Sequence, residues 1–234
     1  PEAHWEKLRV LYARYGSGDD GGTCDHGFEA AAFCVLARLL ALQGANSRAG
    51  GMQAAVPGEA FDVLHSDFGC VAECFASPLN CRWGRFCSAA GDVDRPFGSL
   101  GSFFGFHPSS GSFEANPPYE ARAVADMAAH METLLRRAEA SGSPLSFVVI
   151  IPKWPEEACW KALRDSVFRR ALLELPQAEH GFCEGGQHYR PTRYRQSNHD
   201  STVFVLQSRE GQRIWPPTAA KLDRLAAALR LRQS

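Results

Sequence analysis

Residues 146–151, Ser-Phe-Val-Val-Ile-Ile, form a continuous apolar run of the kind found in strands that are buried on both faces of a parallel sheet. Before this run, the sequence predicts a strand at 112–115 and then an amphipathic helix. The apolar residues of that helix recur at i, i+3, i+4 and i+7 spacing: Val124, Met127, Ala128, Met131, Leu134 and Leu135. After the run, we expect a helix over 157–170, strands at 171–175 and 201–207, and a closing helix over 218–231. This alternation of strands and helices predicts a three-layer α/β domain.

The first third of the chain has a helical pattern instead. Ala/Leu-rich stretches at 5–15 and 28–43 lie between Gly-rich segments, and a third helix is expected over 59–68. A strand at 72–76 and a helix over 80–89 then begin the α/β pattern. We therefore expect an N-terminal helical segment over 1–66, followed by an α/β domain over 67–234.

The composition is that of an ordinary globular protein. Of the 234 residues, 45% are hydrophobic and 22% are charged, which argues against wholesale disorder. The longest apolar run, over 30–42, contains Arg38 and is too short to cross a bilayer. The chain starts at Pro1 without a basic-then-apolar secretion signal. We expect neither secretion nor membrane insertion.

The net charge of −1 hides an uneven distribution. Residues 58–186 carry 11 basic and 17 acidic side chains, whereas residues 187–234 carry nine basic and three acidic ones. A local positive field matters more to a polyanionic partner than the total charge does. Arg accounts for 21 of the 25 basic residues, which suits phosphate recognition, although a GC-rich genome would produce the same bias.

The eight cysteines lack the spacing of a zinc site. Cys70, Cys74, Cys81 and Cys87 are separated by three, six and five residues, which is not a paired C-x-x-C pattern. A disulfide framework is typical of small secreted domains, and neither condition holds here. Reduced structural thiols are the favoured interpretation, and no metal site is expected.

The tetrapeptide Asn116-Pro117-Pro118-Tyr119 follows the predicted strand at 112–115, where open α/β sheets bind ligands. This pattern resembles the acceptor-binding motif of S-adenosylmethionine-dependent amino methyltransferases. The Asn116 side-chain oxygen and the Pro117 carbonyl can accept both N–H bonds of an exocyclic amine and orient its lone pair. Pro117 and Pro118 stiffen the turn, and Tyr119 offers a face on which a base can stack. The alternative is an ordinary Pro-Pro turn.

A cofactor pocket is expected at the end of the preceding strand. Phe75, Ala76, Ser77, Pro78, Leu79 and Asn80 form a small-residue turn rather than a Gly-rich loop. The N-terminus of the helix expected to follow would face the carboxylate of the cofactor. Asp94 is the candidate for binding the ribose hydroxyls, and a solvated loop acid is the alternative. Asn116 completes the predicted cofactor contacts.

Three strings together resemble the phosphorylated-CTD-interacting-factor family of cap-specific adenosine N6-methyltransferases. They are Glu73–Cys81 (ECFASPLNC), Gly111–Tyr119 (GSFEANPPY) and Pro144–Phe147 (PLSF) with Ile151-Pro152. Similarity extends upstream through residues 53–57 and downstream through residues 186–188, Asn198 and residues 232–234, so it covers most of the chain.

The resemblance implies a Rossmann-like class I methyltransferase fold behind the helical segment. It also implies S-adenosyl-L-methionine as cofactor and, as substrate, capped mRNA whose first transcribed nucleotide is adenosine. Asn116–Tyr119 would hold the adenine, and 75–80 would line the cofactor pocket. Tyr119 stands where animal members have Phe, and Lys153 stands where an acidic residue is expected. A nuclear location is implied too. A link to the RNA polymerase II tail would need the family's WW domain, which we do not expect within these residues.

Residues 187–199 combine basic and aromatic side chains. Arg190, Arg193 and Arg195 interleave with Tyr189 and Tyr194, a composition suited to phosphates and stacked bases. We expect six residues to contact RNA: Lys153, His188, Arg190, Arg193, Tyr194 and Arg195. A solvated Arg-rich loop, and a structural role for His188, are the alternatives. Other acceptors (internal RNA adenine, DNA adenine or protein glutamine) and a non-catalytic adaptor for RNA or polymerase remain open as functions.

Overall fold

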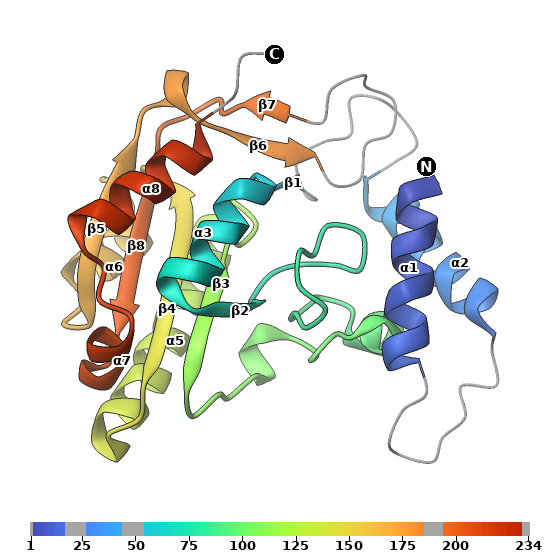
Figure 1. The fold of residues 1–234 in the computed structure, drawn as a ribbon, viewed down its shortest axis with the longest axis horizontal. Helices are drawn as coiled ribbons and strands as arrows, with labels where there is room; N and C mark the ends of the chain where they lie inside the picture. Colours follow the sequence, from blue (N-terminus) through green and yellow to red (C-terminus); the bar gives the residue numbers. More distant parts are fainter. Residues whose placement is uncertain (1, 17–26, 44–53, 185–193, 231–234) are drawn as a thin grey trace.

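The computed structural model describes residues 2–16, 27–43, 54–184 and 194–230. Its centre is a five-stranded sheet with the strand order β2-β3-β4-β8-β5 (Figure 1). The first three strands in this order are parallel, whereas β8 runs antiparallel to both of its neighbours. The strands are Cys70–Glu73 (β2), Gly111–Ala115 (β3), Leu145–Pro152 (β4), Arg169–Leu175 (β5) and Ser201–Gln207 (β8).

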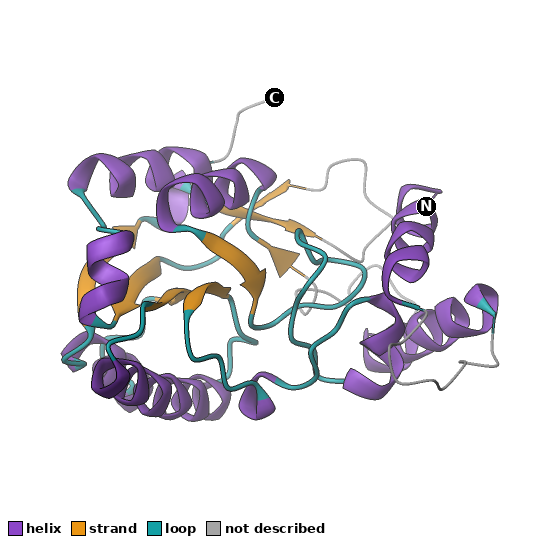
Figure 2. Cartoon of the chain, turned by 60° about the horizontal axis from the view of Figure 1, so that its bottom comes forward, coloured by secondary structure: helices purple, strands orange, loops and turns teal. Residues whose placement is uncertain are grey.

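Helices cover both faces of the sheet, which confirms the three-layer prediction (Figure 2). Along β4, Phe147, Val149 and Ile151 face α5 (Ala121–Ser141) and α6 (Ala158–Asp165). The alternate residues Val148 and Ile150 face α3 (Gly58–Phe68) and α8 (Ala219–Leu229). Strand β4 therefore buries every side chain, as its unbroken apolar sequence predicts. A short helix, α7 (Arg209–Ile214), follows β8.

Beyond β2 the sheet continues only as single-residue bridges. Phe86 bridges in parallel to Glu73 on one side and to Ser99 on the other. The helix predicted over 80–89 is therefore wrong, because the backbone N–H groups of Arg82 and Trp83 donate to the Glu73 carboxylate instead of to helical carbonyls. The strand predicted at 72–76 is β2, which ends at Glu73. The short helices that follow are α4 (Gly91–Asp94), η1 (Arg95–Phe97) and η2 (Phe103–Gly105).

Helices α1 (Glu2–Tyr15) and α2 (Phe28–Gln43) lie at one side of the sheet (Figure 1). They share a separate hydrophobic cluster with Leu79, Phe86 and Phe97 from the segment after β2. Helix α3 also falls within the predicted N-terminal segment, yet it packs on the sheet and on α8. The boundary at residue 66 stays a prediction.

A second, three-stranded sheet was not predicted. It consists of β1 (Ala54–Ala55), β6 (Gly181–Glu184) and β7 (Tyr194–Gln196), paired antiparallel in the order β1-β6-β7. A 3-10 helix, η3 (Gln177–Glu179), connects it to β5. The helix predicted over 157–170 ends at Asp165, because the chain turns at Ser166 and enters β5 at Arg169. Phe182 of β6 contacts the ring of Tyr119, so the second sheet lies beside the carboxyl end of β3 (Figure 1).

Candidate active site

The tetrapeptide Asn116–Tyr119 lies between the end of β3 and the start of α5. Pro117 is buried and Pro118 is exposed, and the Pro118 carbonyl accepts the backbone N–H of Glu120. The Glu120 carboxylate then caps α5 by accepting the N–H groups of Arg122 and Ala123. Glu120 thus fixes the end of the turn that leads into α5.

The side chains of Asn116 and Tyr119 contact each other. The Tyr119 hydroxyl donates to Asn116 Oδ1 at 3.0 Å. An amide oxygen has two lone pairs, so Asn116 Oδ1 keeps one for a substrate N–H. Desolvation of the hydroxyl and the nearby Glu114 carboxyl raise the pKa of Tyr119, so that it stays protonated and remains a donor.

Three further rings surround Tyr119, and the sequence did not single them out. Trp154 follows β4, Phe182 lies in β6 and His199 precedes β8; their ring centroids are 6.5, 6.1 and 5.2 Å from that of Tyr119, each edge-on. The Tyr119 side chain is 37% exposed. This leaves part of the ring available to a planar ligand. The sequence gives one indication of such a role: Trp154 and His199 lie close to the ends of predicted strands, where ligands bind in α/β sheets.

The turn over residues 75–80 is tied together by Ser77 and Asn80. Asn80 Oδ1 accepts the backbone N–H of Ser77 at 2.7 Å and its hydroxyl at 3.1 Å. From α1, the Lys7 ammonium donates to the carbonyls of Leu79 and Cys81. Pro78 and Leu79 are buried, and Ala76 is half-buried. No helix starts here, so the expected helix N-terminus facing a carboxylate is wrong.

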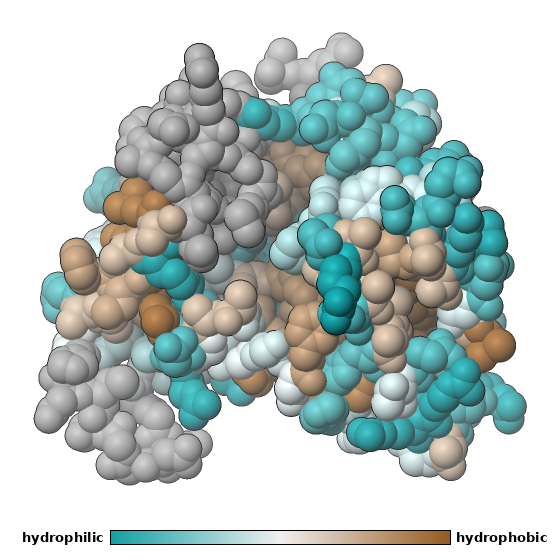
Figure 3. Space-filling model, turned by 180° about the vertical axis from the view of Figure 1, so that it is seen from behind, coloured by the Kyte–Doolittle hydropathy of each residue, from teal (hydrophilic) through white to brown (hydrophobic). Residues whose placement is uncertain are grey.

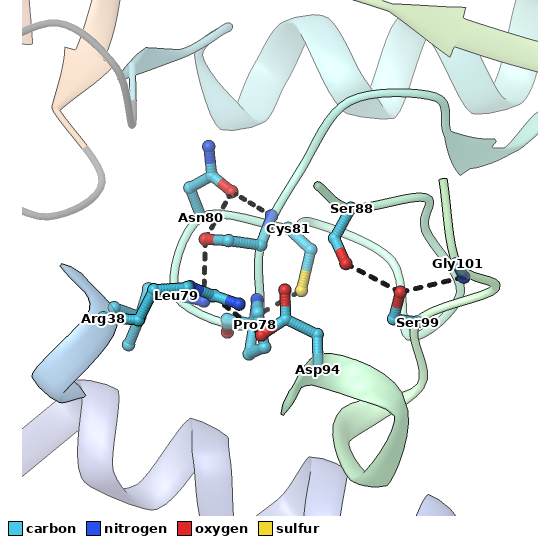
Figure 4. Close-up of polar contacts among 10 residues, drawn as sticks. Arg38, Pro78, Leu79, Asn80, Cys81, Ser88, Asp94, Ser99 and Gly101 are labelled. Atoms are coloured by element: carbon cyan, nitrogen blue, oxygen red, sulfur yellow. Dashed lines mark hydrogen bonds and ion pairs between the residues drawn. The ribbon is translucent and has the colours of Figure 1, made fainter. Parts of the chain in front are cut away.

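Asp94 is held by Arg38 of helix α2 (Figure 4). Its side chain is 1% exposed, and Oδ1 accepts from Arg38 Nη2 of α2 at 2.8 Å. The alternative of a solvated loop acid is therefore wrong. Burial raises the pKa of Asp94, while the Arg38 guanidinium and the Ser88 hydroxyl act in the opposite direction. The predicted ribose contact stays a prediction.

Ser88 and Ser99 lie next to this ion pair: Ser88 comes two residues after the bridging Phe86, and Ser99 is the bridge partner of Phe86. Their hydroxyls are 2.8 Å apart, and Ser99 Oγ also accepts the backbone N–H of Gly101 at 3.1 Å (Figure 4). Sequence reasoning missed these residues, because isolated serines carry no periodicity. They add hydroxyl groups to the polar surroundings of Asp94.

An aromatic group extends from Phe75. Its ring centroid lies 5.1 Å from that of Phe103 and 6.3 Å from that of Phe104, and His130 packs against both of these rings. Phe104 is 44% exposed. Seen from behind, apolar side chains gather in the recess between the surface formed by α1 and α2 and the surface formed by the sheet and its helices (Figure 3).

Two buried acids stand at the carboxyl ends of β2 and β3. Glu73 and Glu114 are register partners and are 3% and 2% exposed. Glu73 Oε2 accepts the N–H groups of Arg82 and Trp83 at 2.7 and 3.1 Å, and burial raises the pKa of Glu73 to about 7. Glu114 Oε1 has no hydrogen-bond partner, and burial together with the Glu73 charge raises the pKa of Glu114 well above its usual value.

The predicted RNA contacts are only partly described. His188, Arg190 and Arg193 lie outside the described residues. Tyr194, in β7, is 49% exposed and Arg195 is half-buried, opposite Phe182 of β6. Since Phe182 contacts Tyr119, the end of the Arg-rich segment lies one strand away from the tetrapeptide.

Lys153 lies just after β4 and already has a partner. Its ammonium donates to Glu174 Oε2 of β5 at 2.7 Å, and this contact raises the pKa of Lys153. RNA binding by Lys153 stays a prediction.

The family model described as "Phosphorylated CTD interacting factor 1 WW domain" matches residues 7–185. The chain belongs to this family. A curated relative from Homo sapiens, named "mRNA (2'-O-methyladenosine-N(6)-)-methyltransferase", is 39% identical over 232 residues, and the protein of the same name from Mus musculus is 39% identical over 231. Both alignments cover 97% of this chain and 32% of the relative, so the chain spans about a third of their length.

Membership of the family agrees with the fold. A central sheet with one antiparallel strand among parallel ones, between two helix layers, fits the predicted class I methyltransferase fold. Within the described ranges, no group of three or more His, Cys, Asp or Glu side chains could hold a metal ion. None of the seven described cysteines forms a disulfide, and Cys24 lies outside the described residues. No described helix is long and apolar enough to span a bilayer.

Proposed function

We propose that this chain transfers a methyl group from S-adenosyl-L-methionine to the 6-amino group of the adenosine next to the 5′ cap of mRNA. The observation that carries the proposal is the Asn116 amide at the end of β3, tethered by Tyr119 within a ring of aromatic side chains. The names of the relatives support the reaction.

The residues present fit this cofactor. Phe75 and the backbone turn over 75–80 lie at the end of β2, and the buried Glu114 carboxyl offers an unused acceptor for a cationic ligand. Asp94, Ser88 and Ser99, a buried polar group, are the proposed contacts of the ribose hydroxyls. When bound, S-adenosylmethionine supplies a methyl group on an electron-poor sulfur.

The chain's own residues prepare the acceptor amine. An exocyclic adenine amine is a weak nucleophile, because its lone pair is delocalised into the ring. Asn116 Oδ1 and the Pro117 carbonyl accept its two N–H bonds and thereby turn the lone pair toward the incoming methyl group. The Tyr119 hydroxyl fixes the amide, and its ring stacks on the adenine, a contact worth about 1–3 kcal/mol. The product amine can release its proton afterwards to water, so no general base is required.

A panel of acceptors tests the proposal. Labelled methyl transfer is measured with capped RNA that begins with adenosine or with 2′-O-methyladenosine, and with uncapped RNA, adenine-containing DNA and a glutamine peptide. We expect transfer to at least one capped RNA and little to the others. Preferred methylation of DNA, uncapped RNA or peptide would contradict the cap assignment. Binding of RNA without binding of the cofactor would favour a non-catalytic adaptor.

The Asn116→Ala variant tests the role of the tetrapeptide. Loss of the acceptor oxygen should reduce kcat about 100-fold or more, because amine orientation is lost. The exposed Gln212 of α7, another amide side chain, serves as the control, and Gln212→Ala should keep near-normal turnover. Unchanged turnover in Asn116→Ala would contradict the acceptor role.

The cellular context belongs to the same proposal. A nuclear location and recruitment by the RNA polymerase II tail, through parts of the protein outside this chain, would bring the enzyme to new caps. The basic segment at 187–199 would then hold the RNA near the tetrapeptide.

A further inference from the structure

Glu114 is a buried acid whose oxygen has no protein partner. It is 2% exposed, and Oε1 makes no hydrogen bond. Side chains alternate between the two faces of a strand, so Glu114 and Asn116 share one face of β3 and its extension. Glu114 also lies close enough to act on the Tyr119 hydroxyl, which donates to the Asn116 amide.

Its register partner Glu73, by contrast, has hydrogen-bond donors for its carboxylate. Glu73 accepts two backbone N–H groups and is influenced by the charges of Lys7 and Arg82. Glu114 has neither: among the described residues, no cationic side chain forms an ion pair with it, and the one charge that acts on it is that of Glu73. Glu114 Oε1 is therefore a buried acceptor left unused by the protein, and burying it without a donor is unfavourable until a group with N–H bonds fills the gap.

The cofactor carries two cationic groups, and only one of them has N–H donors. The sulfonium must face the amine held at Asn116, and it cannot donate a hydrogen bond. The α-ammonium of the methionine part lies four bonds from the sulfur. Glu114 lies two residues behind Asn116, about 6.6 Å along the strand, which matches the reach of that chain.

We propose that Glu114 binds the α-ammonium group of the methionine part of S-adenosylmethionine. This inference rests on the proposed function. In the bound state, an ammonium N–H donates to Glu114 Oε1 and the pair is charge-assisted. The contact would fix the amino-acid end of the cofactor and so position the sulfur beside Asn116.

Calorimetry with two ligands tests the inference. S-adenosylhomocysteine keeps the amino-acid part, whereas 5′-methylthioadenosine lacks it. Glu114→Gln is nearly isosteric. It should weaken the binding of S-adenosylhomocysteine about 10- to 100-fold and change the affinity for 5′-methylthioadenosine by no more than about twofold. The control Glu6→Gln, at an exposed glutamate of α1, should change neither affinity.

A second measurement uses the wild-type chain, so it does not depend on how the variant folds. Deaminated S-adenosylhomocysteine, which keeps its carboxylate, should bind about 10- to 100-fold more weakly than the parent. The inference would be overturned if S-adenosylhomocysteine and its deaminated form bound equally well. It would also be overturned if Glu114→Gln lost affinity for S-adenosylhomocysteine and 5′-methylthioadenosine to the same extent. Either result would leave the proposed function standing. If the wild type binds neither S-adenosylhomocysteine nor 5′-methylthioadenosine, the proposed function fails as well.

Discussion

At the scale of single residues, the hydrogen bond between Tyr119 and Asn116 distinguishes this site from a plain proline turn. The hydroxyl donates to Oδ1 of the amide at 3.0 Å and so fixes the orientation of the Asn116 side chain. The motif predicted an acceptor and a stacking face, but it could not predict this bond. The Tyr119 ring that makes it packs among Trp154, Phe182 and His199, which come from three distant parts of the sequence.

Tyr119→Phe isolates that hydrogen bond, because Phe keeps the ring. Loss of a net contribution of about 0.5–1.5 kcal/mol should lower kcat about two- to tenfold and leave the KM for RNA nearly unchanged. The check is a comparison of the steady-state kinetics of Tyr119→Phe, Asn116→Ala and the double variant that carries both. If the two effects simply add, the hydroxyl does not act through Asn116.

The buried Glu73 predicts a pH dependence of stability. Its pKa rises from 4.5 to about 7 on folding, so the folded state holds a proton that the unfolded state releases between these values. The contribution of Glu73 to the free energy of unfolding is greatest below pH 4.5. It falls by up to about 3 kcal/mol as the pH rises toward 7.

Denaturant unfolding of the wild type and of Glu73→Gln between pH 5 and 8 measures this slope. Gln keeps an acceptor for Arg82 and Trp83 but cannot ionise, so the variant should show the shallower decline. Glu6→Gln should follow the wild type. Parallel curves for the wild type and Glu73→Gln would show that Glu73 does not titrate in this range.

At the scale of elements, periodicity predicted the parts that bury a continuous face. The strand at 201–207 and the helix over 28–43 have the expected bounds. The helix expected over 80–89 is absent, since its amides bind Glu73 and its apolar residues pack against α1 and α2. Such partners are distant in sequence, and no local pattern reveals them.

Helix α1 supports the turn after β2 through Lys7. Lys7→Met removes the ammonium that binds the carbonyls of Leu79 and Cys81, while it keeps most of the apolar stem. Hydrogen exchange at residues 77–81 should become faster, and cofactor affinity should fall several-fold. Lys161→Met, at an exposed lysine of α6 that also donates to a carbonyl, is the control. Unchanged exchange in Lys7→Met would show that α1 does not hold the turn.

At the scale of the whole molecule, the candidate site and the end of the Arg-rich segment lie at the same edge of the sheet. The carboxyl ends of β2, β3 and β4 place the turn over 75–80, the tetrapeptide and Trp154 at one edge. The second sheet brings the start of β7, and with it the end of the Arg-rich segment, to the same edge. The near-neutral net charge therefore does not argue against a nucleic-acid substrate.

The identity of the methylated nucleoside tests the central claim most directly. Capped RNAs that begin with adenosine or 2′-O-methyladenosine, and a matched RNA that begins with guanosine, are incubated with the chain and S-adenosylmethionine. The products are digested to nucleosides and analysed by mass spectrometry. We predict N6-methylation of the first adenosine alone, none on the guanosine-start RNA, and none with Asn116→Ala. Methylation at another position or atom, or turnover that survives Asn116→Ala, would contradict the claim.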